Sequence, residues 1–320
     1  MDDKYQILKD IYILRQTFSE ELSKNLKLIP TPAPLFVDKQ SGLNDNLNGV
    51  ERPVQFMTKG GEDLEVIHSL AKWKRYALYK FGIESGHGIV TDMRAIRRDE
   101  DLDAIHSYYV DQWDWEKVIS KEQRSLAFLK ETVTEIFQAL KTTEDILLKK
   151  VPNLSRKLPD EISFITTQEL EDRYPNLTPK ERENIIAKEK KAVFIIGIGK
   201  KLKSGNRHDL RAPDYDDWEL NGDILVYDPV LDSSLELSSM GIRVDDESLK
   251  RQLKECNCLE RLELPFHEKI IKKQLPYSIG GGIGQSRLCM FMLEKQHIAE
   301  VQPSTWKSIS KQLDEISFLI

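Results

Sequence analysis

The sequence contains few cysteines and no long hydrophobic run, and these two absences exclude several classes of protein. Its 320 residues include only three cysteines, too few for a disulfide framework in a chain of this size. Cys256 and Cys258 have no second Cys or His pair at a spacing that would complete a zinc site. No apolar run could span a bilayer, and the polar start Met-Asp-Asp-Lys is not followed by a signal-peptide core. We therefore predict a cytoplasmic protein with reduced thiols and no membrane partner.

Net positive charge and the common nucleotide-binding fingerprints are absent too. The chain has 47 Lys and Arg against 53 Asp and Glu, a formal net charge of −6, which argues against a nucleic-acid partner bound across a basic surface. Gly197-Ile-Gly199 lacks the third glycine of a dinucleotide-binding turn, and no Gly-Lys-Ser/Thr of a P-loop occurs. Hydrophobic residues make up 40% of the chain, enough to bury a substantial core.

A glycine run, Gly280-Gly-Gly-Ile-Gly-Gln-Ser-Arg287, lies directly before an apolar helical stretch. Glycines allow close approach of the backbone to a ligand, and the first turn of a helix offers free N–H groups to an anion. Arg287 would add a permanent charge there. Taken alone, the run is also typical of a glycine turn before an ordinary helix.

The spacing of apolar residues predicts alternating groups of strands and helices. Residues 5–26 have helical spacing, and Pro30, Pro32 and Pro34 then predict an extended arm. Further helices are predicted at 70–79, 120–150, 178–190, 245–255 and 283–293. Strands are predicted at 35–37, 53–58, 64–68, 89–96, 105–113, 192–197, 222–227 and 235–244, with a polar loop at 199–218. Strands joined by turns, with helices between groups of them, predict an α+β fold with a mainly antiparallel sheet flanked by helices.

Polar side chains alternate with apolar ones on two of these strands. Gln112 and Asp114 share one strand face, with Trp113 and Trp115 on the other, although an ordinary half-buried strand has the same pattern. Other polar groups stand where a site could form: Arg97, His106, Asp223, Glu236, Arg243 and Arg287.

The later strand offers a second set of polar groups. Glu236 and Ser238 are predicted on one face, with Ser239 opposite. Asp223 and Glu236 together would suit a hard cation such as Mg²⁺, although Asp223 is equally typical of a simple turn.

Seven stretches closely resemble, in order along nearly the whole chain, those of the ammonia-dependent asparagine synthetase (aspartate-ammonia ligase) family. They are Ser41-Gly-Leu-Asn-Asp-Asn-Leu47, Val66-Ile-His-Ser-Leu-Ala-Lys-Trp-Lys-Arg75, Tyr109-Val-Asp-Gln-Trp-Asp-Trp-Glu116, Arg211-Ala-Pro-Asp-Tyr-Asp-Asp-Trp218, Asn221-Gly-Asp-Ile-Leu225, Glu236-Leu-Ser-Ser-Met-Gly-Ile-Arg243 and Gly280-Gly-Gly-Ile-Gly-Gln-Ser-Arg287. The glycine run alone would support only the wider class II aminoacyl-tRNA synthetase fold. The resemblance implies a single catalytic domain over 1–320 of that fold, usually a homodimer, with the helix and arm at 1–37 as the contact.

The resemblance also implies a two-step, AMP-forming ligase reaction. L-Aspartate and ATP with Mg²⁺ would give β-aspartyl-AMP and pyrophosphate, and ammonia would then displace AMP to give L-asparagine. Arg97 would hold the α-phosphate, His106 would lie near the pyrophosphate, and Arg287 near the γ-phosphate or adenine. Asp223 and Glu236 would carry Mg²⁺. The remaining ATP contacts implied are Ile105, Gly282 and Gly284.

For aspartate, the resemblance implies partners of both charges. Candidates for its carboxylate are Ser69, Lys74, Gln112 and Ser239, and candidates for its ammonium are Asp45, Asp114 and Asp216. Asp45 is the first choice for binding ammonium and accepting its proton instead. Ser238 and Arg243 are further substrate contacts implied, and the catalytic set is Asp45, Arg97, Gln112, Asp216 and Arg287. Ser69 is also typical of a helix N-cap, and either Lys72 or Lys74 would be an ordinary solvated charge.

Three alternatives follow from the same residues. Glutamine-dependent synthesis needs an N-terminal cysteine, which is lacking, so we expect ammonia from solution. A tRNA synthetase would need an anticodon-binding barrel, for which we expect no spare segment, leaving a paralogue that only makes adenylates. A sensor of aspartate or asparagine would not need the full set of phosphate and metal ligands. The loop at 199–218 is predicted to close over the bound adenylate.

Overall fold

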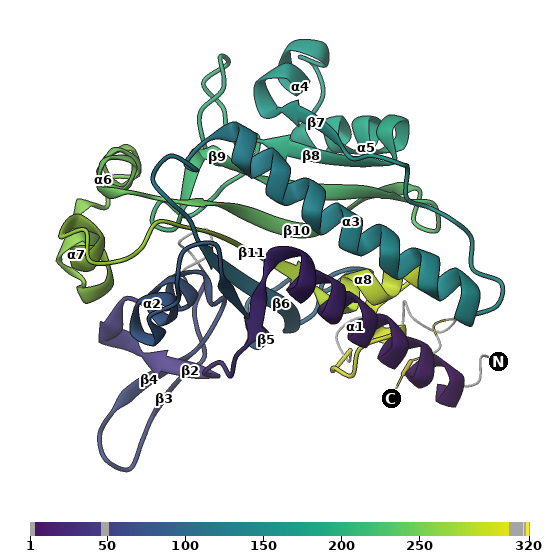
Figure 1. The fold of residues 1–320 in the computed structure, drawn as a ribbon, viewed down its shortest axis with the longest axis horizontal. Helices are drawn as coiled ribbons and strands as arrows, with labels where there is room; N and C mark the ends of the chain where they lie inside the picture. Colours follow the sequence, from purple (N-terminus) through teal and green to yellow (C-terminus); the bar gives the residue numbers. More distant parts are fainter. Residues whose placement is uncertain (1–3, 46–50, 307–315, 317, 320) are drawn as a thin grey trace.

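An eight-stranded sheet runs through the middle of the computed structural model, which describes residues 4–45, 51–306, 316 and 318–319 (Figure 1). In spatial order its strands are β1 (Leu28–Pro30), β5 (Gly88–Ile96), β6 (Tyr109–Val118), β11 (Ser278–Gly284), β10 (Ser233–Arg243), β9 (Asp216–Asp228), β8 (Ala192–Ile196) and β7 (Ser163–Thr166). The outer pairs β1–β5 and β7–β8 are parallel, and the five pairings between them are antiparallel. The predicted mainly antiparallel sheet is confirmed.

Two long helices, α1 and α3, lie side by side across one face of this sheet (Figure 1). The helices in chain order are α1 (Lys4–Leu26), α2 (Ala71–Phe81), α3 (Leu126–Lys150), α4 (Thr167–Arg173), α5 (Pro179–Lys190), α6 (Asp246–Glu255), α7 (Pro265–Ile271) and α8 (Gln285–Met292). The buried residues of α1, among them Leu14, Phe18 and Leu22, recur every three or four positions. Phe18 meets Trp113 of β6 with ring centroids 4.7 Å apart, so the main core lies between these helices and the sheet.

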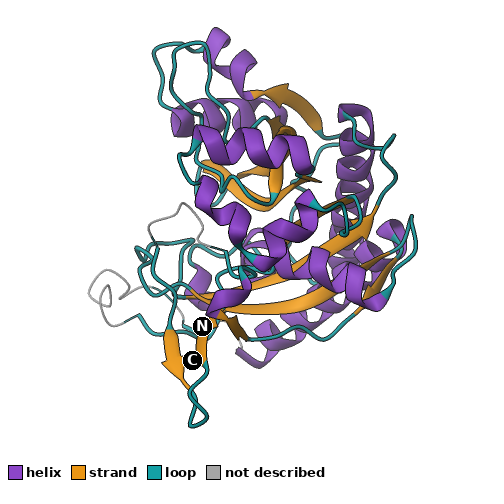
Figure 2. Ribbon diagram, turned by 90° about the vertical axis from the view of Figure 1, so that its left-hand side faces the viewer, coloured by secondary structure: helices purple, strands orange, loops and turns teal. Residues whose placement is uncertain are grey.

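A separate three-stranded sheet contains the strands predicted at 35–37, 53–58 and 64–68. Its strands are β2 (Phe36–Asp38), β4 (Asp63–Val66) and β3 (Gln55–Met57), in that spatial order. The turn between β3 and β4 projects from the body of the molecule, as two views at right angles show (Figures 1 and 2). Asn46 and Leu47, which end the first motif, and residues 1–3 of the predicted 1–37 contact lie outside the described residues.

Several predicted boundaries shift because local polar groups end or begin an element. The strand predicted at 105–113 begins at Tyr109, since Asp103 Oδ1 accepts the backbone N–H groups of Ile105 and His106, each at 2.8 Å, and turns the chain. The helix predicted from residue 120 begins at Leu126, because Ser125 Oγ accepts the Phe128 N–H and caps it.

The glycine run is a central strand rather than a turn. It forms β11, between β6 and β10, and α8 begins only at Gln285. A Cβ on Gly282 would lie 2.3 Å from Gln112 Oε1, so a side chain from β6 already fills that space. The glycines therefore leave space for long polar side chains of neighbouring strands to cross the sheet surface. Arg287 lies in the first turn of α8, as predicted.

Two further segments differ from the prediction. The polar loop at 199–218 ends earlier, because Asp216 pairs with Arg243 and begins β9. β7 and α4 were not predicted, although Thr166 and Glu169 form a capping box whose sequence pattern marks a helix start.

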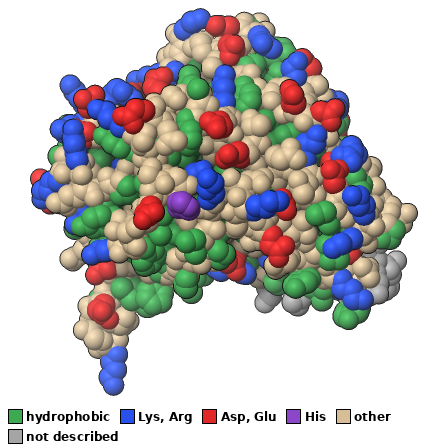
Figure 3. All heavy atoms as spheres, in the orientation of Figure 1, with side chains coloured by type: hydrophobic (Ala, Val, Ile, Leu, Met, Phe, Trp, Pro, Cys, Tyr) green, Lys and Arg blue, Asp and Glu red, His purple; other side chains and the backbone are tan. Residues whose placement is uncertain are grey.

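The surface and the helices add two observations. Acidic and basic side chains are interspersed over the face drawn in Figure 3. Among the described residues, no helix is both long and apolar enough to cross a membrane. The single-domain organisation over 1–320 stays a prediction.

Candidate functional site

A cavity of about 520 Å³ opens on the sheet face away from α1 and α3. Trp113 and Trp115 of β6 point into the core beneath these helices, and the alternation of side chains along a strand sends Gln112 and Asp114 into the cavity. The structure brings all but two of the predicted site residues to its walls: Asp45, Ser69, Lys74, Arg97, Ile105, His106, Gln112, Asp114, Asp216, Glu236, Ser239, Arg243, Gly282, Gly284 and Arg287.

One transverse row of the sheet crosses the floor of the cavity, and three of its four members line the cavity itself. Asp114 of β6 lies opposite Gly282 of β11, which lies opposite Ser239 of β10, which in turn lies opposite Asp223 of β9. Directly paired residues project from the same face, so four strands place these positions side by side. Motifs that are separate in the chain thus meet in one spatial row, in an order set by strand pairing.

Lys74 and Asp114 form a buried ion pair at one end of the cavity. Lys74, from α2, is 1% exposed, and its Nζ contacts Asp114 Oδ1 and donates to the Gly281 carbonyl at 2.9 Å. Burial lowers the pKa of Lys74, against the opposing effect of the Asp114 charge. Asp114 Oδ2 is buried without a hydrogen-bond partner among the described residues, which leaves one strong acceptor for a ligand.

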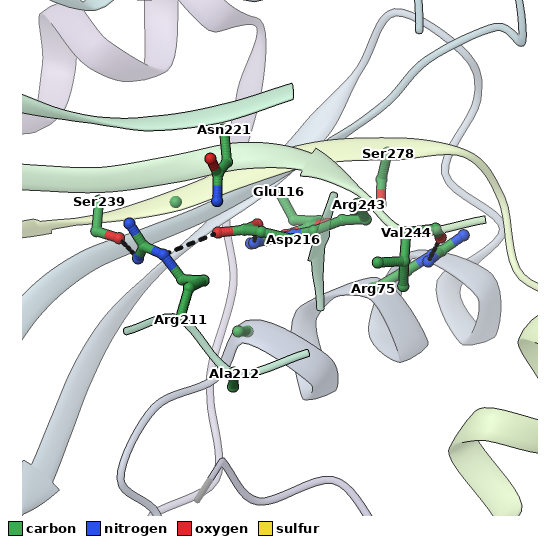
Figure 4. Close-up of polar contacts among 12 residues, drawn as sticks. Arg75, Glu116, Arg211, Ala212, Asp216, Asn221, Ser239, Arg243, Val244 and Ser278 are labelled. Atoms are coloured by element: carbon green, nitrogen blue, oxygen red, sulfur yellow. Dashed lines mark hydrogen bonds and ion pairs between the residues drawn. The ribbon is translucent and has the colours of Figure 1, made fainter. Parts of the chain in front are cut away.

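Arg243 is held between two carboxylates in the same region (Figure 4). Its Nη2 donates to Glu116 Oε2 at 2.7 Å, its Nε donates to both Glu116 oxygens, and its Nη1 contacts Asp216. Ser278 Oγ donates to Glu116 Oε1 at 2.7 Å and fixes that carboxylate from behind. Arg243 and Asp216 line the cavity, while Glu116 is fully buried beside Gly280. We call the cavity wall formed by Lys74, Asp114, Asp216, Ser239 and Arg243 the sheet end.

Arg211 reaches the sheet end from the loop that precedes β9 (Figure 4). Its guanidinium contacts Ser239 Oγ and Asp223 Oδ1, and its Nε lies 4.0 Å from Asp216 Oδ2. Burial, opposed by the charge of Arg211 and reinforced by repulsion from Glu236, raises the pKa of Asp223 to about 7. Arg211 therefore ties the loop to the floor of the cavity.

The opposite wall consists of Arg97, His106, Ser286, Arg287 and Gln302. We call it the hairpin end, after the connection between β5 and β6 that carries Arg97 and His106. Among the described residues, the Arg97 side chain pairs with Glu100 at 3.7 Å, and its Nε is buried without a hydrogen-bond partner. His106 Nδ1 lies 2.8 Å from Asp103. Arg287 donates to two backbone carbonyls, Ile105 at 3.4 Å and Glu236 at 3.2 Å. Arg97 and Arg287 are thus less committed to protein carboxylates than Lys74 and Arg243 are.

Asp45 and Ser69 form a third polar pair on the cavity wall. Ser69 Oγ donates to Asp45 Oδ2 at 2.9 Å, and Asp45 is 1% exposed. Ser69 also accepts the Ala71 N–H at 3.3 Å, although Leu70 holds the N-cap position of α2. The serine therefore supports both the helix start and the acid.

Ser238 and Asp223 are the two predicted site residues that do not line the cavity. The predicted alternation on β10 is wrong at this point, because the register shifts between Glu236 and Ser238. The extra residue changes the face presented after it, so Glu236 and Ser239 share the cavity while the Ser238 hydroxyl is buried. Asp223 is 6% exposed and is covered by its contact with Arg211.

Asp223 and Glu236 are suited to only part of a metal site. Among the described residues, no group of three or more His, Cys, Asp or Glu side chains is placed to hold a metal ion. Burial and the nearby charge of Glu236 raise the pKa of Asp223, and such a pair of carboxylates suits Mg²⁺ when it arrives with phosphate oxygens. The residues fit a cation shared with a ligand rather than a closed metal centre.

Neither lysine of the second motif is a solvated charge, which corrects the sequence interpretation. Lys72 is 3% exposed, and its Nζ lies 3.1 Å from Asp214 Oδ2. His267 and Arg261 contact the same oxygen at 2.9 and 3.2 Å. The charges of these partners lower the pKa of Asp214 despite its burial, and the cluster anchors the loop just before Asp216.

Comparison with known proteins assigns the chain to a family. The model of the aspartate-ammonia ligase family matches residues 5–316. The chain belongs to the aspartate-ammonia ligase family. The aspartate-ammonia ligase of Fusobacterium nucleatum is 60% identical over 303 residues, which cover 95% of this chain and 92% of that protein. That of Clostridium perfringens is 61% identical over 295 residues, covering 92% and 88%. The protein is therefore a carbon–nitrogen ligase of asparagine synthesis.

Solved structures place this ligase family chain in the class II aminoacyl-tRNA synthetase fold. Asparaginyl-tRNA synthetase from Pyrococcus horikoshii, complexed with asparaginyl-adenylate, superposes with a TM-score of 0.69 at 14% identity, over 94% of this chain and 69% of that one. The Entamoeba histolytica asparaginyl-tRNA synthetase complex gives 0.65 at 14% identity, over 96% and 68%. The predicted fold class is confirmed.

Sequence reasoning missed three residues of this ligase site, and two of them had a readable signal. Glu116 continues the period of two from Gln112 and Asp114, so the same alternation places it on their face. Arg211 opens a motif that was recognised, but only its acids were chosen. Gln302 lies beyond every recognised motif, and only packing brings it to the hairpin end.

Proposed function

We propose that the protein joins aspartate and ammonia through a β-aspartyl-AMP intermediate, with release of pyrophosphate and then AMP. The observation that carries the proposal is that a single cavity joins a sheet end of paired charges to a hairpin end of loosely held cations. The first suits a small zwitterionic acid, and the second suits a chain of phosphates. Their junction is where a carboxylate would meet an α-phosphate.

At the sheet end, the charges are arranged for the amino-acid part of aspartate. Asp114 Oδ2 lacks a partner among the described residues, so we assign it to the α-ammonium group. Lys74 and Arg243 supply N–H donors for the α-carboxylate, with the Gln112 amide beside them. Because both cations are already fixed by carboxylates, their donors need little reorganisation when aspartate binds. The β-carboxylate is then left to point toward the hairpin end.

At the hairpin end, the cations offset the repulsion between two reacting anions. Attack of the β-carboxylate on the α-phosphate brings negative charge together, and Arg97, whose Nε has no hydrogen-bond partner among the described residues, is assigned to meet it. His106 and Arg287 are assigned to the departing pyrophosphate and the outer part of ATP. Ile105, Gly282 and Gly284 supply backbone and space for the nucleotide.

Mg²⁺ is assigned to Asp223 and Glu236. When bound, the ion would neutralise phosphate charge. Arg211 holds Asp223 in the meantime, so these residues maintain a compact acidic pair without an exposed excess charge.

Asp45 is assigned to the second step, in which ammonia attacks the activated carbonyl. Only neutral ammonia is a nucleophile, so a carboxylate near the attack site can bind ammonium and accept its proton. Asp45 lines the cavity, and the Ser69 hydroxyl orients it. Asp216, fixed by Arg243, is the neighbouring acid assigned to catalysis.

The loop before β9 carries a further assignment. Leu210, Arg211 and Ala212 line the cavity, which supports closure of the loop over the adenylate. Limited proteolysis should show less cutting in this loop when aspartate and ATP are present; unchanged cutting would count against closure. The cytoplasmic location also stays a prediction.

A homodimer contact is assigned to the segment at 1–37. Tyr5, Leu8 and Tyr12 are 65%, 51% and 68% exposed on α1, at spacings of one helical face. Truncation before Leu35 would also remove buried Phe18, so Tyr12→Glu is the cleaner variant. Sedimentation should show monomer for Tyr12→Glu and dimer for the native chain, whereas a persistent dimer would remove this assignment.

The test of the proposed function is product formation by purified protein with aspartate, ATP and Mg²⁺. Ammonium and glutamine are compared as nitrogen donors, and asparagine, AMP and pyrophosphate are measured together. Asparagine and AMP in equal amounts with ammonium alone are expected. Pyrophosphate exchange without asparagine would instead indicate an enzyme that only makes adenylates, and no ATP turnover would indicate a sensor.

A further inference from the structure

Gln302 brings one amide from the C-terminal part of the chain to the hairpin end. It lies beyond α8 and the short helical turn Ile298–Glu300, and only 1% of its surface is exposed. Its side chain lines the cavity together with Ser286 and Arg287. A buried amide at a cavity wall must satisfy both its N–H₂ group and its carbonyl oxygen.

The hydrogen bonds around Ser286 fix which way this amide points. Ser286 Oγ donates to Asp111 Oδ2 at 2.9 Å, and Asp111, which pairs with Arg15 at 2.8 Å, can only accept as a carboxylate. The hydroxyl has a single proton, so it must accept from its other neighbour. Gln302 Nε2, at 3.0 Å from Ser286 Oγ, is therefore the donor. The amide oxygen Oε1 must lie on the other side of the group.

That oxygen has no hydrogen-bond partner among the described residues, and it is buried. A buried acceptor without a donor is unfavourable, and such orphans are rare in folded proteins. The series of hydrogen bonds that fixes the amide, from Arg15 through Asp111 and Ser286, does not use Oε1. Because the amide lines the cavity, a group that enters the cavity can supply that donor.

We propose that Gln302 Oε1 accepts a hydrogen bond from the nucleoside part of ATP and so contributes to nucleotide selectivity. The inference rests on the proposed use of ATP at the hairpin end. Two parts of the nucleoside offer the required donor, the 6-amino group of adenine and the ribose hydroxyls. A 6-oxo purine would place an acceptor opposite this acceptor, and a deoxynucleotide would lack the hydroxyl donor at the deleted position.

The test compares ATP with ITP, 2′-deoxy-ATP and 3′-deoxy-ATP in the full-length enzyme and in Gln302→Met. Methionine keeps the length of the side chain and removes both polar groups. In the native enzyme, kcat/KM for ATP should exceed that for at least one analogue by about 10-fold. In Gln302→Met, this preference should fall to about one while the KM for aspartate stays unchanged. The analogue that loses its disadvantage identifies the donor.

Loss of kcat/KM by one common factor for all four nucleotides would overturn the inference, because a purely structural role changes all four alike. Unchanged ratios would overturn it as well. Gln302→Asn keeps the amide but shortens the side chain, so the amide no longer reaches the ligand. This variant should reduce the same preference with less effect on the melting temperature than Gln302→Met has. If the native enzyme forms no AMP from ATP, the proposed function fails with the inference; if it does and the ratios do not move, the inference alone fails.

Discussion

The sheet end and the hairpin end of the cavity hold their charges in different ways. At the sheet end, Arg243 and Lys74 are 2% and 1% exposed, and each is fixed by a carboxylate of β6. At the hairpin end, Arg97 pairs among the described residues with Glu100 at 3.7 Å, and His106 is about one-third exposed at its side chain. The sheet end thus forms part of the folded core, whereas the hairpin end leaves a donor of Arg97 for the proposed ligand.

This difference separates two kinds of catalytic residue. Removing a partner from a buried ion pair leaves a charge without compensation, so folding and function fail together. Removing a cation whose partner is a ligand changes the reaction and leaves the fold intact. Four substitutions, in decreasing order of expected effect, test whether the two ends differ in this way.

The largest effect is expected for Arg243→Met. It would leave Glu116 and Asp216 buried without their shared cation, which should lower the free energy of unfolding by about 3–5 kcal/mol and abolish asparagine formation. Chemical denaturation and the product assay measure the two effects. Native stability in this variant would show that the sheet end is not part of the core. Arg251→Met is the control, because Arg251 is a largely exposed cation that contacts Asp217.

Arg97→Ala should affect the reaction alone. We expect kcat to fall by roughly 100-fold to 1,000-fold, as when a transition-state donor is removed, with an unchanged melting temperature. Steady-state kinetics and thermal denaturation check both halves. Arg156, whose side chain is 54% exposed and which does not line the cavity, provides the control Arg156→Ala. Equal losses in the two variants would contradict the role assigned to Arg97.

Glu236→Gln tests the Mg²⁺ site proposed at Asp223 and Glu236. Losing one of two carboxylate ligands should raise the Mg²⁺ concentration for half-maximal activity about 10-fold, because Mg²⁺ is held by few protein oxygens. Activity is titrated with Mg²⁺ after chelation, at saturating aspartate and ATP. Glu219→Gln, on an exposed carboxylate paired with Lys200, is the control. An unchanged Mg²⁺ dependence would remove Glu236 from the site.

The smallest effect is expected for Gly282→Ala. The new Cβ would stand 2.3 Å from Gln112 Oε1, the far end of a side chain that can shift, so overpacking should cost about 1–3 kcal/mol at most. We expect the KM for aspartate to rise several-fold because Gln112 is displaced. Gly60→Ala is the control, since the nearest atom to its Cβ would be 3.7 Å away. A native KM in Gly282→Ala would show that Gln112 does not contact aspartate.

The sequence predicted the sheet end better than the hairpin end, and the reason is periodicity. Alternation on β6 placed Gln112 and Asp114 on one face because hydrogen bonds to two neighbouring strands hold that strand regular. The same rule failed on β10, where the bulge before Ser238 reverses the faces. A bulge depends on the partner strand, so one strand's pattern does not reveal it.

At the hairpin end, prediction depended on tertiary contacts that have no local signal. Asp103 turns the chain and shortens β6, and Gln302 reaches the cavity only because Ser286 binds its amide. The glycine run shows the same limit, since its composition suggested a turn while its pairing with β6 and β10 makes it a strand. The resemblance predicted which motifs occur and in what order along the chain. Only the strand register shows how these motifs come together in space.

The most direct measurement of the central claim follows an oxygen atom from aspartate. Aspartate carrying a heavy-oxygen label in its β-carboxylate is incubated with the enzyme, ATP, Mg²⁺ and ammonium, and the AMP is analysed by mass spectrometry. If the β-carboxylate attacks the α-phosphate where the two ends meet, each AMP formed carries one labelled oxygen. AMP without label, or label found in inorganic phosphate beside ADP, would contradict the β-aspartyl-AMP intermediate.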